Sequence, residues 1–120
     1  MEALLSLHDR FGVAIVLYLV AAGLWGLLLG VRGVAPTAGY RGALIIAEGV
    51  IVLQGLLGVG VYVGGRPAEP MHLLYGAALV VALPLAWTIV RDRQPRGQSV
   101  ALGLAALFAA GLALRGMATA

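Results

Sequence analysis

The chain contains two histidines, and each begins the same short pattern of residue types. An aromatic residue follows each histidine by three positions, and a glycine follows it by four. In a helix the residue at i+4 lies on the same face as the first, one turn further along. Each histidine would therefore stand beside a position without a side chain. The two patterns are His8, Phe11 and Gly12 in the first half of the chain, and His72, Tyr75 and Gly76 in the second.

Two such imidazoles, brought face to face in a helical bundle, can bind both axial positions of a haem iron. A glycine beside each imidazole lets a flat macrocycle approach the backbone, and a forked guanidinium suits its propionates. Without any cysteine the chain cannot attach c-type haem or hold an iron–sulfur cluster, so haem b is the predicted cofactor. The predicted site comprises the iron ligands His8 and His72, the glycines Gly12 and Gly76, the flanking aromatics Phe11 and Tyr75, and the propionate partners Arg10 and Arg66.

Either histidine alone has a simpler interpretation, because histidines near the ends of apolar segments often lie among lipid headgroups. Ionisable groups inside a membrane nevertheless favour a functional role. The duplication of the pattern at matching depth favours the ligand interpretation over the interfacial one.

Long apolar segments would have to position these histidines. Hydrophobic residues make up 62% of the chain and charged residues 11%, whereas soluble domains average about one half and one quarter. A spanning helix needs about 20 mostly apolar residues, and runs that do not alternate exclude β-barrel strands. The sequence therefore predicts an all-α integral membrane protein, a four-transmembrane-helix bundle with spans at Phe11–Gly30, Gly42–Val63, Met71–Val90 and Ser99–Leu114.

The connecting segments carry most of the charge, and all eight basic residues are arginines. Five lie in segments 32–41 and 91–98, which would share one side of the membrane, and three lie on the other side. Since positive loops stay in the cytoplasm, both termini are expected on the outer side of the cell (inner) membrane, with both histidines near its outer face. The excess of basic over acidic residues therefore reflects multi-pass topology in a lipid bilayer, and no nucleic-acid partner is predicted.

An internal repeat accompanies the histidine pattern. The sequence Val31-Arg32-x-x-x-Pro36 matches Val90-Arg91-x-x-x-Pro95 at the opposite ends of the same two spans. Residues 1–63 and 64–120 are therefore predicted to be two parallel helical-hairpin repeats within one domain, 1–120. A two-fold axis along the membrane normal would relate them.

A family resemblance follows from the second span and the residues after it. Gln54-Gly-Leu-Leu-Gly58, followed by His72-Leu, resembles the Gln-Gly-x-Leu-Gly … His-Leu pattern of haem A synthase, which converts haem O to haem A. Members of that family have eight helices in two similar halves, each with a pair of outward-facing histidines. The resemblance covers residues 5–85 and implies a chain similar to one four-helix half.

The sequence departs from that family before its first histidine. The family's glutamate three positions earlier is replaced by Leu5, and the arginine that follows the histidine is displaced to Arg10 by Asp9. The resemblance therefore implies a haem-binding half-module, with a role in electron transfer or in haem and respiratory-complex biogenesis, and does not extend to haem hydroxylation. Such a module could work as a homodimer or within a larger respiratory or photosynthetic complex. No catalytic residue is predicted.

Glu48 is the one acidic residue inside a predicted span, where a lone charge is costly. It could relay protons or bind a transported substrate, or it could be a protonated or Arg41-paired packing residue. Gln54 is expected to hydrogen-bond across the bundle and not to contact a substrate. Two alternative functions remain open: a cofactor-free accessory subunit of a larger membrane complex, and a small transporter that uses Glu48.

Overall fold

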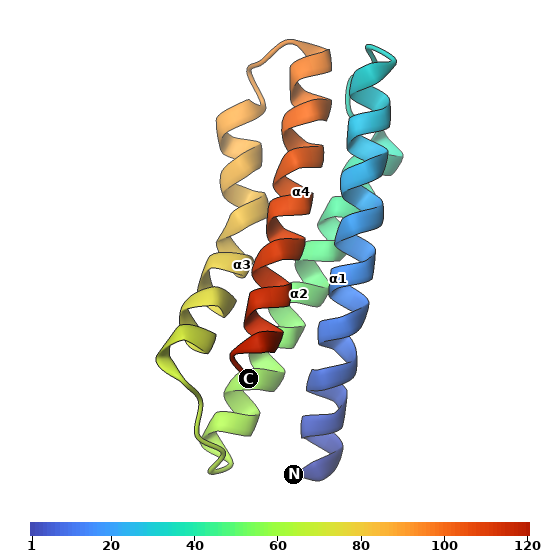
Figure 1. The fold of residues 1–120 in the computed structure, drawn as a ribbon. Coiled ribbons are helices and arrows are strands. Elements are labelled where there is room, and N and C mark those ends of the chain that lie inside the picture. The colour runs from blue at the N-terminus through green and yellow to red at the C-terminus, as the bar shows by residue number, and fades with distance from the viewer.

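The computed structural model describes all residues, 1–120, as an all-helical chain (Figure 1). Its helices are α1 (Glu2–Val31), α2 (Ala38–Val63), α3 (Pro70–Val90) and α4 (Pro95–Ala118). All four are long and apolar enough to cross a membrane. The prediction of an all-α chain with four candidate transmembrane helices is confirmed at this level.

The helices are longer than the apolar segments from which they were predicted. α1 begins at Glu2, so His8 lies inside the helix and does not precede it. α3 and α4 each begin with a proline, Pro70 or Pro95, whose fixed φ suits the first helical position. Hydropathy locates only the apolar part of a helix, and the backbone hydrogen bonds continue beyond it, mainly toward the N-terminal ends of these helices.

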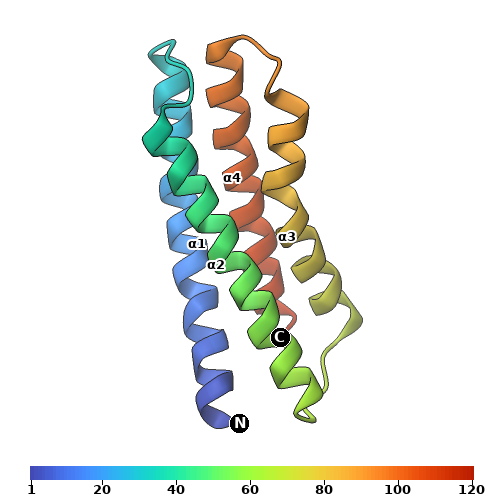
Figure 2. The same cartoon turned by 180° about the vertical axis from the view of Figure 1, so that it is seen from behind.

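The bundle has two different ends. The arginine end contains the α1–α2 and α3–α4 connections, residues 32–37 and 91–94. The histidine end contains the N-terminus and the α2–α3 connection, residues 64–69. Both views show that α4 stops short of the histidine end, so the C-terminus lies between the other helices at a level above the N-terminus (Figures 1 and 2).

The helices follow the order α1, α4, α3, α2 around the bundle. The α1–α4 interface is the most extensive and the α2–α3 interface the least, while α1 and α3 share no close backbone contact. The lower half of α3 leans away from the bundle in both views (Figures 1 and 2). A two-fold axis between the hairpins would make the α1–α4 and α2–α3 interfaces equivalent, and these are the two that differ most.

The close α1–α4 packing depends on a glycine seam, formed by Gly23, Gly26 and Gly30 of α1 and Gly103 of α4. A Cβ atom on Gly103 would lie 2.8 Å from both the Gly23 carbonyl oxygen and the Leu27 amide nitrogen. Real side chains cannot approach backbone that closely. Small residues at such positions allow membrane helices to pack backbone against backbone.

Hydrogen bonds to backbone carbonyls reinforce the bundle near its arginine end, where the glycine seam also lies. Each is donated by a side chain of α2 or α4 to a carbonyl in α1 or in the connection that follows it. The bonds run from Tyr40 Oη to Ala22 O (2.9 Å), from Ser99 Oγ to Val34 O (2.6 Å) and from Arg96 Nε to Gly30 O (2.9 Å).

Candidate functional site

A cavity of about 860 Å³ occupies the histidine end. Residues from all four helices line it, most of them hydrophobic, and His8 and His72 are among them. Its size falls in the range of small-molecule and cofactor sites, about 300–1,000 Å³. The cavity exists because α4 ends early and α2 and α3 hardly touch.

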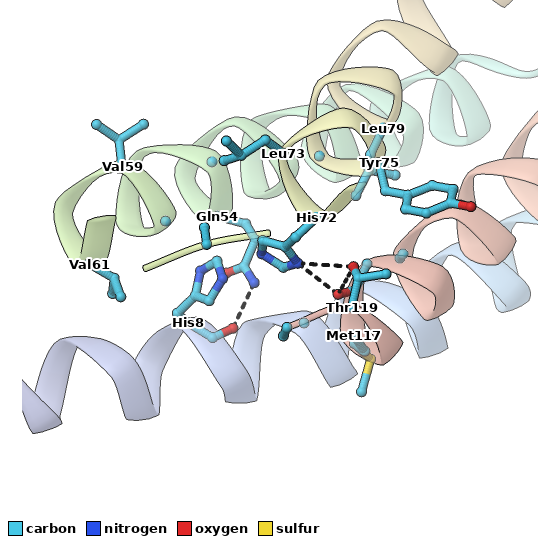
Figure 3. Close-up of a pocket in the computed structure, with 18 of the residues that line it drawn as sticks. His8, Gln54, Val59, Val61, His72, Leu73, Tyr75, Leu79, Met117 and Thr119 are labelled. Atoms are coloured by element: carbon cyan, nitrogen blue, oxygen red, sulfur yellow. Dashed lines mark hydrogen bonds between the residues drawn. The ribbon is translucent and has the colours of Figure 1, made fainter. Parts of the chain in front are cut away.

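The two imidazoles face each other inside this cavity, although they come from helices on the bundle diagonal (Figure 3). The ring centroids of His8 and His72 are 6.1 Å apart, and the ring planes are inclined by 69°. Two metal–nitrogen bonds of about 2 Å each, extended by the two ring radii, place the centroids of trans imidazole ligands about 6 Å apart. The observed separation leaves room for a single metal ion between the rings and also falls in the range of an ordinary edge-to-face pair of rings.

The end of α4 orients the ring of His72. Its Nδ1 atom lies 2.8 Å from the Gly116 carbonyl oxygen and 3.4 Å from Thr119 Oγ1. Because a carbonyl can only accept, Nδ1 carries the proton and Nε2 is left with its lone pair. Gly116 belongs to the last turn of α4, where carbonyls lack a partner four residues on. Metal-binding histidines typically have this arrangement, with one nitrogen donating to a carbonyl.

α2 holds His8 in place. A Cβ atom on Gly58 would lie 3.1 Å from Cε1 of His8, so the imidazole rests on a stretch of α2 without a side chain. Gln54, one turn earlier, donates from Nε2 to the His8 carbonyl oxygen at 2.6 Å. The predicted cross-bundle hydrogen bond of Gln54 is thereby confirmed.

The chemistry of the residues present suits a haem, which His8 and His72 would hold. Nδ1 of His8 is fully buried without a partner. The Nε2 atoms of His8 and His72 are not among the buried unpartnered atoms and form no hydrogen bond, so both are reachable from the cavity. No group of three or more His, Cys, Asp or Glu side chains could hold a metal ion. An iron here would thus have two protein nitrogens and take its other ligands from a macrocycle.

The other predicted site residues are only partly gathered there. Gly12, Gly76, Tyr75 and Arg66 line the cavity, whereas Arg10 and Phe11 do not. A Cβ atom on Gly76 would meet nothing within 4 Å, but one on Gly12 would contact the side chains of Gln54 and Met117 at 3.5 and 3.8 Å.

Tyr75 is directed away from the imidazoles (Figure 3), and the Arg115 guanidinium lies 5.7 Å from its ring centroid. Arg66 is exposed and shares the cavity lining with the carboxylates of Asp9 and Glu69. The cavity lining therefore contains one basic and two acidic side chains among mostly hydrophobic residues.

Three residues of the site were not predicted from the sequence, namely Gly58, Gly116 and Thr119. Gly58 follows Gln54 at i+4, the same spacing that singled out the glycines after the histidines, and this signal could have found it. The contacts of Gly116 and Thr119 have no sequence signal, because they depend on where α4 ends relative to α3.

The fold defines the class of this protein: an all-α, four-helix chain whose helices are candidate membrane spans. No protein-family model, curated protein or solved structure matches the chain. The resemblance to haem A synthase is therefore carried by the motifs in residues 5–85 alone and stays a prediction.

Proposed function

We propose that this protein is a multi-pass membrane protein that binds one b-type haem at its histidine end, with His8 and His72 as axial ligands. The 6.1 Å separation of the two imidazoles supports this assignment most strongly. The arginine distribution favours an orientation with this end, and both termini, outside the cell membrane.

The residues around the cavity suit such a cofactor. The Gly116 carbonyl holds the proton of His72 on Nδ1, and α2 supports the ring of His8. The hydrophobic lining would exclude water, and Arg66 could pair with a propionate. A haem with two imidazole ligands transfers single electrons. We infer a role in electron transfer or in haem and respiratory-complex biogenesis, as a homodimer or within a larger respiratory or photosynthetic complex.

An absorption spectrum of the detergent-purified protein tests the proposal. The expected result is the Soret and α bands of low-spin, six-coordinate haem in the reduced protein. His8→Ala and His72→Ala should each abolish the low-spin spectrum. Gln98→Ala, which removes an exposed hydrogen bond at the arginine end, should leave the spectrum intact. Circular dichroism reports whether each variant is folded.

Imidazole rescue separates loss of a ligand from loss of the fold. In His8→Gly and His72→Gly, free imidazole should enter the vacated space and restore the low-spin bands. The proposal is overturned if neither alanine variant changes the spectrum, or if the protein stays colourless after incubation with haemin. Colourless protein that co-purifies stoichiometrically with other subunits would instead establish the accessory-subunit alternative.

A further inference from the structure

A second cavity lies nearer the arginine end and is separate from the histidine pair. Its volume is about 530 Å³, and its lining comes from α2, α3 and one residue of α4. Leu102 of α4 and Leu83 of α3 form a buried floor, at 2% and 5% exposure. Because α2 and α3 barely pack against each other, this cavity opens sideways, toward the surface that a bilayer would cover.

Glu48 contributes an oxygen that has no other role in the fold. Its Oε1 is buried without a hydrogen-bond partner, whereas Oε2 forms no hydrogen bond and is not among the buried atoms, so Oε2 is the oxygen that a ligand in the second cavity can reach. A bare carboxylate is costly in hydrocarbon. In its neutral form Glu48 can donate one hydrogen bond and accept another.

Arg41 and Trp87 provide the other polar groups of this lining. Arg41 precedes Glu48 by seven residues, so the two lie on the same face of α2, about 10 Å apart along its axis. No hydrogen bond joins Arg41 to the Oε1 atom of Glu48. Trp87 adds an indole N–H donor and a flat ring. The remaining lining residues are aliphatic, proline or glycine: Ala38, Gly42, Leu44, Ile45, Leu83, Pro84 and Leu102.

These groups specify the ligand. All three polar side chains can donate hydrogen bonds, so a matching ligand has acceptors such as carbonyl oxygens. Because Arg41 and Glu48 are separated along α2, these acceptors should lie at opposite ends of the ligand. The aromatic face of Trp87 suits a flat ring, and entry from lipid requires an uncharged, lipophilic molecule. A lipophilic cation fits less well, because the guanidinium of Arg41 lines the same space and would repel it.

We propose that the cavity formed by Arg41, Glu48 and Trp87 binds the head group of a lipid-soluble quinone. One carbonyl would accept from Glu48 and the other from Arg41, with the ring beside Trp87. The proposal concerns binding only and is independent of the haem site, since the two cavities share no lining residue.

Fluorescence of Trp87 provides a direct test, because quinones quench indole emission. The chain has two tryptophans, and Trp25→Phe leaves Trp87 as the single reporter. Titration of this variant in detergent with decylubiquinone should give saturable quenching. In the reverse reporter, Trp87→Phe, the emission of Trp25 should show only the linear quenching caused by quinone dissolved in the micelle.

Two substitutions of Glu48 in the Trp25→Phe background identify the chemistry. Glu48→Leu removes the donor and should weaken binding about tenfold, as expected for one buried hydrogen bond. Glu48→Gln keeps a donor without any charge, so it should bind within about threefold of the parent. The same titration in a His72→Ala background should give an unchanged affinity, which separates this site from the haem proposal.

The proposal is overturned by linear quenching at Trp87, or by equal affinity in Glu48→Leu and the parent. It is also overturned if Glu48→Gln loses binding as completely as Glu48→Leu while tetraphenylphosphonium binds the parent protein. That last result would assign the cavity to lipophilic cations and support the transporter alternative.

Discussion

The two ends of this bundle are built from the same four helices by opposite means. At the arginine end the glycine seam brings α1 and α4 into backbone contact, and side chains of α2 and α4 bond to carbonyls across the interface. At the histidine end α4 stops early, α3 leans away, and a cavity of about 860 Å³ remains between the helices.

The difference indicates that one end of the bundle provides stability and the other provides space. Helices in lipid gain no hydrophobic stabilisation from association and depend on close packing and hydrogen bonds. The glycine seam supplies such packing at one end, so the other end can leave space for a ligand. We expect substitutions in the seam to change stability and substitutions around His8 to change binding.

The largest effect is expected from Gly103→Ala. The added methyl group would overlap the backbone of α1 at 2.8 Å, so the helices must separate, at a cost of about 3 kcal/mol. Gly111→Ala is the matched control on the same helix, where a Cβ atom meets nothing within 4 Å. That change should be neutral or stabilise by about 0.5 kcal/mol through helix propensity. Thermal unfolding in detergent measures both, and equal effects would show that the seam is not a stability determinant.

The next effect concerns the histidine end. Gly58→Val places a branched side chain where Cε1 of His8 is already only 3.1 Å from the Cβ position. The imidazole must move, and we expect haem affinity to fall about tenfold while thermal stability changes little. Gly49→Val on the same helix meets open space and should leave haem binding unaltered. A haemin titration compares the two, and equal midpoints would remove Gly58 from the site.

The sequence indicated the secondary structure of this chain better than its packing. Unbroken apolar runs located all four helices, and the polarity of Gln54 within a span was enough to predict its bond across the bundle. No sequence pattern predicted that the α1–α4 interface is extensive and the α2–α3 interface small. It depends on which glycines face a neighbouring helix, and Gly103 does whereas Gly111 does not.

The site divides in the same way. The duplicated pattern singled out His8 and His72, whose rings lie 6.1 Å apart in the structure; ligation of an iron is what the spectrum tests. The acceptor at Gly116 could not be predicted, because it is a backbone carbonyl that becomes available only where a helix ends. Arg10 and Phe11 have suitable types and spacing, yet they do not line the cavity.

A smaller effect on stability should distinguish two tyrosines whose hydroxyl groups each donate a hydrogen bond between α1 and α2. Tyr40 is fully buried and bonds to the Ala22 carbonyl at 2.9 Å, whereas Tyr18 is exposed and bonds to the Ala43 carbonyl at 2.7 Å. Tyr40→Phe removes a buried hydrogen bond between α2 and α1 and should cost about 1 kcal/mol of unfolding free energy. Tyr18→Phe should cost less than about 0.5 kcal/mol. The reverse order would mean that burial does not decide how much each of these hydrogen bonds contributes to stability.

The smallest change in stability is expected from Gln54→Leu. This variant loses the 2.6 Å bond to the His8 carbonyl but also removes Oε1, a buried atom without a partner. The two effects oppose each other, since an unpaired buried acceptor is itself destabilising, and the net loss should stay below about 0.5 kcal/mol.

The local effect of Gln54→Leu should be larger. Because α1 loses its hydrogen bond to α2 beside His8, amide hydrogen exchange should accelerate around His8 and not at the glycine seam. Gln98→Leu, whose bond to the Arg91 carbonyl is exposed, serves as the control. Acceleration at both ends alike would mean that the bundle opens as one unit and that its two ends are not independent.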